Sequence, residues 1–454
     1  MKPPIKLFAL ISYCVFAPLA NAASWQANDT ATLQQALQQA KDNDVIQLNQ
    51  GTYQGPWEIT VPLTLNCSQG AVIDGQQHAD AIRVKAPQVS IRGCRIINWG
   101  DNLTKMNAGI FVEKAASDIL IEHNEFYGDT FGIWLDSPVN ARVYHNRIEG
   151  NEAIRSQDRG NGIHLFATKG ADVAYNEVWH TRDGIYIDTS NGNQLRNNEL
   201  HHLRYGVHYM YSYRNEVSGN YTHHTRTGYA LMQSKYLKVL NNRSEYDENY
   251  GILMNYITYS EISGNQIKHI QTGTSPTGSA SINGAEGKAL FIYNSPFNTL
   301  SNNLLQQSDL AIHVTAGSED NEIYGNEFIA NQQQVKYVST RAQEWSKEGK
   351  GNYWSDYLGW DRNGDGIGDT HYEPNDGVDK VLWKYPAAKV LMNSPAIETL
   401  RWIQREFPVL KATGIKDSYP LMHPRPKESA QKGSDPKSTD KASTHSGTTE
   451  GDPA

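Results

Sequence analysis

Apolar and polar residues alternate strictly in a short segment that recurs along this chain. Each copy starts at a glycine or alanine, and the residues one and three places later are apolar or aromatic. Alternation with a period of two is typical of a strand that buries one face. The copies are GIFV (109–112), GIWL (132–135), GIHL (162–165), GIYI (184–187), GVHY (206–209), GYAL (228–231), GILM (251–254), ALFI (289–292) and AIHV (311–314).

An asparagine recurs in step with these segments. Its steps are 22 or 23 residues, apart from two of 30 and 38, and the longer steps contain polar, glycine-rich insertions. A period near 22 is too short for paired helices and suits one coil of three short strands. We therefore predict an all-β fold, a right-handed parallel β-helix, with an asparagine ladder at one turn. The asparagines are Asn124, Asn146, Asn176, Asn198, Asn220, Asn242, Asn265, Asn303 and Asn326.

The same register predicts the buried ladder of the core. Residues that follow the glycine by one place point inward, and each stacks on its equivalent in the next coil. Coils lie about 4.8 Å apart, as neighbouring strands do. The predicted inward ladder is Ile110, Ile133, Ile163, Ile185, Val207, Tyr229, Ile252, Leu290 and Ile312.

The N-terminal part of the chain continues the pattern. Segments 45–48, 63–65 and 89–91 supply earlier coils, and residues 32–41 read as a short amphipathic helix that covers the open end of the core. Cys67 and Cys94 fall at nearly equivalent places on successive coils. A disulfide between them is feasible, and the sequence leaves it open.

The two ends of the chain have other compositions. Residues 1–22 carry Lys2 and Lys6, a short apolar run and Ala20-Asn21-Ala22, which is typical of a cleavable secretory signal. No other apolar run approaches the ~20 residues of a membrane span. Residues 424–454 are almost devoid of apolar side chains and are predicted to be disordered. We expect a signal peptide (1–22), a β-helix (23–340), a C-terminal capping and docking segment (341–423) and a tail (424–454).

Charge narrows the range of partners. The net charge of −8 argues against nucleic acid or an anionic lipid surface as the main partner. The chain contains no GxxxxGK[ST] motif, so any nucleotide hydrolysis belongs to another protein.

A candidate metal site lies on the outward face of the repeated strand. Residues two and four places after the glycine point outward, which puts His208 and Met210 on one face and Met232 beside Met210 on the next coil. Packing alone does not explain an outward pair of methionines. Imidazole together with thioether favours copper, particularly Cu(I), over calcium or magnesium.

A second column lies four residues after each asparagine, where a strand enters a turn. It reads His180, His202, His224, Tyr246 and His269. Ladders of like residues at turns are often only structural, so each of these histidines is either a hydrogen-bonded turn residue or a metal ligand. If they bind, His202 and His224 are further ligands for the copper, with His180 next in the column.

A calcium-like loop follows the last coil. Asp361, Asn363, Asp365 and Asp369 stand at positions 1, 3, 5 and 9 of the loop, and the twelfth position is Tyr372 where an EF-hand carries glutamate. Either the loop binds calcium or its carboxylates tie a structural turn without metal.

A resemblance to a known family rests on the C-terminal segment. The chain resembles the NosD family in GNYWSDYLGWDRNGDGIGDTHY (351–372), EPNDGVDK (373–380), LWKYPAAKVLMNSPAIETLRWIQREFPVL (382–410) and KDSYPLM (416–422). That family comprises periplasmic accessory proteins of nitrous-oxide-reductase maturation. The resemblance implies periplasmic localisation, a copper role in building the reductase's copper–sulfur centre, and three kinds of partner: an ABC transporter (membrane permease plus ATPase), a copper chaperone and the reductase.

Two functions of different classes remain open. The first is a copper-handling maturation factor that performs no covalent chemistry. The alternative is a carbohydrate-active enzyme, a uronate epimerase or polysaccharide lyase, because Asp136, His164, Tyr186 and Asp188 share the outward face and offer acid and base groups.

A helix is predicted from Ser394 in the C-terminal segment, with serine as N-cap and Pro395 at the first position. Its apolar side contains Ile397, Leu400, Ile403 and Phe407. This helix either covers the open end of the β-helix or docks on the transporter.

Overall fold

The chain divides into two units, Met1–His423 and Pro424–Ala454, and the first contains all the helices and strands named here. The computed structural model describes residues 22–272, 287–339, 341–375, 378–379, 385, 394–407 and 414–426. The predicted signal peptide, except its last residue, and most of the predicted tail lie outside the described residues.

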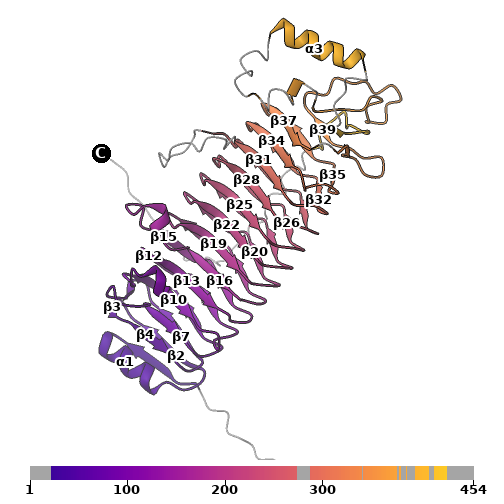
Figure 1. Ribbon diagram of the computed structural model, residues 1–454. Coiled ribbons are helices and arrows are strands. Elements are labelled where there is room, and N and C mark those ends of the chain that lie inside the picture. The colour runs from indigo at the N-terminus through magenta and orange to yellow at the C-terminus, as the bar shows by residue number, and fades with distance from the viewer. Residues whose placement is uncertain are drawn as a thin grey trace, which may run out of the picture. The chain divides into compact units, whose positions relative to one another are not determined.

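Three parallel sheets form the fold, and from β2 to β37 successive strands along the chain go to different sheets (Figure 1). Sheet 1 contains, in spatial order, β1 (Ser24–Ala27), β2 (Asp44–Leu48), β5 (Leu63–Cys67), β8 (Ser90–Arg92), β11 (Leu120–Glu122), β14 (Arg142–Tyr144), β17 (Asp172–Ala174), β20 (Gln194–Arg196), β23 (Glu216–Ser218), β26 (Lys238–Leu240), β29 (Glu261–Ser263), β32 (Thr299–Ser301) and β35 (Glu322–Tyr324).

Sheets 2 and 3 repeat the same order of coils. Sheet 2 contains β3 (Gly51–Gln54), β6 (Ala71–Asp74), β9 (Arg95–Ile97), β12 (Glu125–Gly128), β15 (Arg147–Gly150), β18 (Glu177–Trp179), β21 (Glu199–His201), β24 (Tyr221–His223), β27 (Arg243–Glu245), β30 (Gln266–Lys268), β33 (Leu304–Gln306), β36 (Glu327–Ile329) and β39 (Tyr353–Trp354). Sheet 3 contains β4 (Trp57–Ile59), β7 (Ile82–Val84), β10 (Ala108–Val112), β13 (Phe131–Asp136), β16 (Ile163–Phe166), β19 (Asp183–Asp188), β22 (Tyr205–Met210), β25 (Thr227–Met232), β28 (Tyr250–Asn255), β31 (Lys288–Tyr293), β34 (Leu310–Thr315) and β37 (Gln333–Val338).

The glycine-led segments are the strands of sheet 3, as predicted. Ile133 pairs with Ile163 and Ile163 with Ile185, so the register is the one counted from the sequence. All members of the predicted inward ladder, from Ile110 to Ile312, are at most 1% exposed. The parallel β-helix is confirmed.

The asparagine ladder bonds one coil to the next at the turn between sheets 1 and 2. Asn176 donates from its backbone N and from Nδ2 to Oδ1 of Asn198, at 3.0 and 2.9 Å, and Asn198 repeats this with Asn220. Nδ2 of each residue also donates to a backbone carbonyl of the preceding coil, as Asn198 does to Val173. The ladder runs one step beyond the predicted set, to Asn352.

The N-terminal end of the core is closed by α1 (Thr30–Gln39). This helix begins two residues earlier than predicted because Asp29 forms a capping box with Thr32. Leu33 and Ala36 are buried in the core. Cys67 and Cys94 form a disulfide between successive coils.

Bulky residues of the C-terminal segment close the other end. Trp345, Trp354 and Ile415 are at most 2% exposed and belong to the main core. The pairing of β38 (Gln343–Glu344) with β40 (Ile415–Lys416) brings this distant stretch back onto the last coils.

The predicted C-terminal helix is α3 (Pro395–Glu406), with Ser394 as its N-cap. Its Leu400, Trp402 and Phe407 are about half exposed, at 49, 54 and 56%. Short 3-10 turns lie at Leu103–Lys105 and Ser156–Asp158. Within the described part of the chain, no helix is long and apolar enough to cross a membrane.

Candidate metal centre

His208 lies on the outward face of β22, in a fixed orientation. Its Nδ1 is 2.9 Å from Oδ2 of Asp183, which is buried in β19 and also accepts two hydrogen bonds from Arg204. Because a carboxylate only accepts, Nδ1 of His208 carries the proton, and Nε2 keeps its lone pair. The rings of Tyr186 and Tyr205 flank the imidazole at 4.5 and 5.0 Å.

The charge of Asp183 is maintained by its partners. Burial alone would raise the pKa of this carboxyl, but hydrogen bonds from His208 and Arg204 outweigh burial and lower the pKa. A permanent carboxylate behind an imidazole is a common arrangement for a metal-binding histidine.

Met210 and Met232 occupy matching outward positions on neighbouring strands. Tyr209 pairs with Leu231, so the next residue of each strand is one of the two methionines. Tyr209 and Leu231 are fully buried, whereas both methionines are partly exposed. The structure therefore places two thioethers on the face that carries His208.

The turn column holds a second group of imidazoles. His202 and His224 stack with ring centroids 5.4 Å apart, and His180 approaches His202 at 5.6 Å. Tyr246 and His269 continue the stack. All five turn residues have φ between 54 and 58°, the left-handed conformation of a tight turn. The turn histidines His180, His202 and His224 contact one another. His208 instead contacts Asp183, Tyr186 and Tyr205.

Two further histidines belong to this group and were missed by the sequence argument. His201 and His223 end β21 and β24, pair in register on sheet 2, and stack at 4.8 Å. Nδ1 of His201 is 2.8 Å from Nδ1 of His202, and the corresponding distance from His223 to His224 is 2.9 Å. The doublets His201-His202 and His223-His224, one coil apart, are the signal that would have found them.

The surroundings keep part of this group neutral. Burial is the main cause that lowers the pKa of His201 to about 4, and His223 and His202 lower it further. The pKa of His202 and that of His224 are also lowered, in both cases chiefly by burial. Neutral imidazole is the form that binds metals.

Among the described residues, no three side chains of the types His, Cys, Asp and Glu are arranged to hold a metal ion. Those four residue types do not include the methionines, Met210 and Met232.

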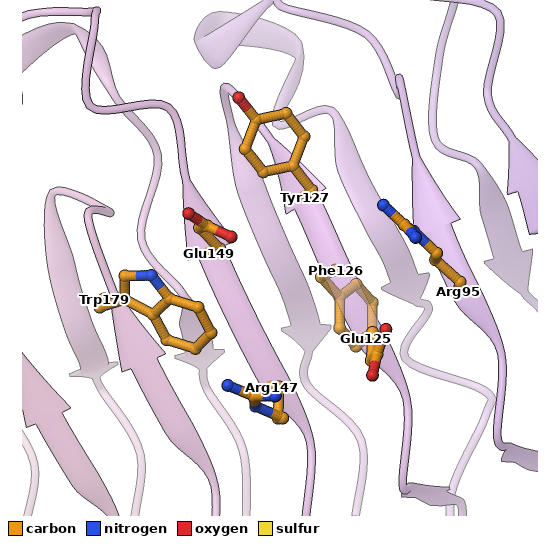
Figure 2. Close-up of a pocket in the computed structure, with 7 residues that line it drawn as sticks. All are labelled: Arg95, Glu125, Phe126, Tyr127, Arg147, Glu149 and Trp179. Carbon is orange, nitrogen blue, oxygen red and sulfur yellow. The ribbon is translucent and has the colours of Figure 1, made fainter.

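A shallow hollow of about 180 Å³ lies on the outer face of sheet 2, on the N-terminal side of the histidines. Figure 2 shows Arg147 and Trp179 on neighbouring strands at one side of it, with Tyr127 across from them. Trp179, which lines the hollow, also stacks on His201 with the ring centroids 5.7 Å apart, so the hollow lies next to the histidine group. Its lining residues are Arg95, Glu125, Phe126, Tyr127, Arg147, Glu149 and Trp179.

The enzyme hypothesis places its acid and base groups on an open outward face. In the structure, His164 is buried and Tyr186 is partly buried. His164 is 7% exposed against Trp134, and burial lowers its pKa to about 3. Burial raises the pKa of Tyr186 to about 12. Asp136 and Asp188 accept hydrogen bonds from the hydroxyls of the turn residues that follow them. Efficient proton transfer needs a pKa near the working pH, so the imidazole and the phenol are poorly tuned for it.

The calcium-like loop is held by its own carboxylates. Asp361 accepts hydrogen bonds from the backbone N of Gly364 and Gly366, and Asp365 accepts one from Ile367. Asp369 accepts one from Arg362, and Asn363 donates to Asp365. These bonds account for the residue pattern without a cation, and calcium binding stays a prediction.

Similar solved structures share only the fold. A surface adhesin of Streptococcus pneumoniae has a TM-score of 0.52 at 10% identity, over 69% of this chain and 91% of its own. The A-module of the mannuronan C-5 epimerase AlgE6 of Azotobacter vinelandii has a TM-score of 0.51 at 13% identity, over 70% of this chain and 95% of its own. An adhesin and an epimerase on one fold leave function undecided.

Sequence relatives are far closer. Residues 144–359 match the family model described as periplasmic copper-binding protein (NosD). A protein of Pseudomonas aeruginosa named probable ABC transporter binding protein NosD is 58% identical over 83% of this chain and 89% of its own length. One of the same name from Stutzerimonas stutzeri is 57% identical over 82% of this chain and 85% of its own. The chain therefore belongs to the NosD family.

Proposed function

We propose that this protein is a periplasmic maturation factor that handles copper for the copper–sulfur centre of nitrous-oxide reductase. It takes copper from a copper chaperone, holds the ion on its outward face, and presents it to the reductase in an assembly with an ABC transporter. The name of the matching family, a periplasmic copper-binding protein, supports the metal and the compartment. The names of the two relatives support the transporter.

The copper site is His208, Met210 and Met232. The observation that carries this proposal is the hydrogen bond between Nδ1 of His208 and Asp183, because it leaves Nε2 as a donor atom on the strand face that also carries Met210 and Met232. Two soft sulfur ligands and one imidazole favour Cu(I). His180, His202 and His224 belong to the turn group, and we propose them as further copper ligands.

The transporter contact is α3. Its Leu400, Trp402 and Phe407 expose about half of their surface, although these are the residue types that protein interfaces bury. The end of the core is closed by Trp345 and Trp354, so α3 is not required for that purpose. The proposed partner of these exposed apolar residues is the membrane permease of the ABC transporter.

A Cu(I) competition titration tests the site. Met210→Leu with Met232→Leu preserves volume and apolarity, so folding should change by less than about 1.5 kcal/mol. Cu(I) affinity should fall on the order of 100-fold, since two of three proposed ligands are lost. Met106→Leu, an exposed methionine elsewhere, is the matched control and should bind as the parent does.

Activity in cells gives the second measurement. The double variant should yield a reductase that lacks its copper–sulfur centre, and the control should yield an intact one. A double variant that binds Cu(I) as tightly as the parent and still supports maturation rules out this site.

A further inference from the structure

Four imidazoles form a two-by-two array where sheet 2 turns into sheet 3. Stacking joins the two coils, at 4.8 Å for the inner pair of rings and 5.4 Å for the outer pair. Adjacency along the chain joins the residues of each coil, because the left-handed turn at the second histidine brings its ring back beside the first. The members are His201, His202, His223 and His224.

Within each coil the two Nδ1 atoms face each other. The separations are 2.8 Å on one coil and 2.9 Å on the next. Two nitrogens bound at right angles to one metal ion, each at 2.0–2.1 Å, lie about 2.9 Å apart. A hydrogen bond between two imidazoles has a similar length. The distance therefore fits both a chelate and a histidine–histidine hydrogen bond, and the groups facing the opposite nitrogens distinguish the two.

Carboxylates on the same sheet face the opposite nitrogens. Nε2 of His223 is 3.3 Å from Oε1 of Glu199. Nε2 of His201 is 3.7 Å from Oε1 of Glu177, one coil earlier. A carboxylate next to Nε2 favours the tautomer protonated there, which leaves the Nδ1 lone pair for a metal. Both glutamates also supply negative charge next to a dication.

We propose that this array binds one divalent copper ion through its Nδ1 atoms. One pair acts as the initial chelate, and the second pair completes the coordination after its rings turn toward the ion. Nitrogen-only donors suit Cu(II) more than Cu(I), and Cu(II) binds such sites most tightly among the divalent first-row metals. The array differs in this respect from the proposed Cu(I) site, which uses sulfur. The inference rests on the proposed function only for the choice of copper.

Access from solvent is available at the outer pair. His224 is exposed and His202 is partly exposed, whereas the side chains of His201 and His223 are 15 and 16% exposed. An incoming ion thus first meets His202 and His224 at the turn, and the less exposed His201 and His223 on sheet 2 then bind it. Trp179, stacked on His201, closes the array on its N-terminal side.

The experiment is titration of the untagged mature protein with Cu(II), followed by electron paramagnetic resonance. The parent should bind one ion tightly, with hyperfine structure from at least three nitrogens. His201→Gln with His223→Gln should weaken that ion on the order of 100-fold and reduce the number of coupled nitrogens. Glu199→Gln, which leaves all four imidazoles, should weaken it about 10-fold.

A matched control lies elsewhere on the same fold. His123 and His145 also stack on neighbouring coils, at 4.9 Å, but each is a single exposed histidine on its coil. His123→Gln with His145→Gln should leave the Cu(II) signal unchanged. A tight signal that survives the His201 and His223 changes, or is lost in the control, overturns the inference. A parent that binds no tight Cu(II) also overturns it, and the two-histidine contacts are then hydrogen bonds only.

The outcomes separate this inference from the proposed function. Loss of Cu(II) binding in the array variant, with Cu(I) binding and reductase maturation unaffected, supports the site and places it outside the main copper route. If the array binds no Cu(II) but the methionine-dependent site still binds Cu(I), the proposed function still stands.

Discussion

The backbone N–H of Asn352 donates a 2.7 Å hydrogen bond to the carboxylate of Asp417, 65 residues further along the chain. Asn352 is the last member of the asparagine ladder, and the same Oδ2 accepts from its Nδ2 and from Nε1 of Trp354. All three residues are at most 1% exposed. Asp417 thus satisfies the donors that have no further coil to bond to.

Removing this carboxylate should destabilise the C-terminal end of the fold. Asp417→Ala leaves the buried backbone N–H of Asn352 and Nε1–H of Trp354 unpaired, whereas Nδ2 of Asn352 keeps the carbonyl of Trp345. Each unpaired donor costs about 1–3 kcal/mol. We expect a total of about 3–5 kcal/mol, seen as lower urea and thermal midpoints of unfolding. Asp417→Asn keeps one oxygen acceptor and should lose less than half as much. An alanine variant as stable as the parent would show that the ladder does not depend on this cap.

Stability should decrease in acid because buried histidines stay neutral. Burial lowers the pKa of His313 from 6.5 to about 3, and the charges of Lys288 and Lys336 add to the effect. The unfolded chain then binds a proton below pH 6.5 that the folded chain does not bind. The contribution of His313 is therefore complete above pH 6.5 and is lost as the pH falls toward 3.

His313→Phe isolates that contribution. Phenylalanine keeps the stack on Phe291, which lies 4.8 Å away, and both ring nitrogens of His313 are buried without a hydrogen-bond partner in the described structure. The variant should lose about 2 kcal/mol less than the parent between pH 7 and 4.5, measured by urea unfolding at a series of pH values. Parallel curves for the two proteins would contradict the assignment.

The coils were predictable because hydrogen bonding between them fixes the spacing. Ile133 and Ile163 pair as counted, although 30 residues separate them, since the insertion between them leaves the register of the strands unchanged. The closure of the C-terminal end was not predictable. It depends on Asp417 and on the pairing of Gln343 with Ile415, contacts between remote segments that carry no periodic signal.

The site was predictable only in part, for geometric reasons. Strand alternation placed Met210 and Met232 on one face, but counting four residues from the asparagine found His202 and passed over His201. Alternation separates adjacent residues onto opposite faces, whereas the left-handed turn at His202 returns its ring to the side of His201. The burial of outward His164 depends on a local cover, including Asn161 in contact with its ring, that alternation does not encode.

The carboxylates of the enzyme hypothesis should be dispensable. Asp136 and Asp188 bond the hydroxyls of Ser137 and Thr189, at 3.0 and 2.8 Å. Asp136→Asn with Asp188→Asn should change stability by less than about 0.5 kcal/mol each and leave reductase maturation intact. Incubation of the purified parent with a uronate polymer gives the opposite test. Release of unsaturated or epimerised sugar would favour the enzyme.

The exposed apolar residues of α3 and of its C-cap provide the last prediction, which concerns the transporter. Leu400→Ala, Trp402→Ala and Phe407→Ala together remove the apolar side chains, and alanine favours the helix. Loss of buried interface residues of this kind costs about 2–4 kcal/mol, so affinity for the detergent-solubilised permease–ATPase complex should fall on the order of 100-fold. The circular dichroism spectrum and the thermal midpoint should stay close to those of the parent. The matched control is Leu358→Ala with Trp360→Ala, an exposed apolar pair at 90 and 69% in the loop that follows β39. Equal binding by the α3 variant, or loss of binding only in the loop variant, would assign the contact to another surface.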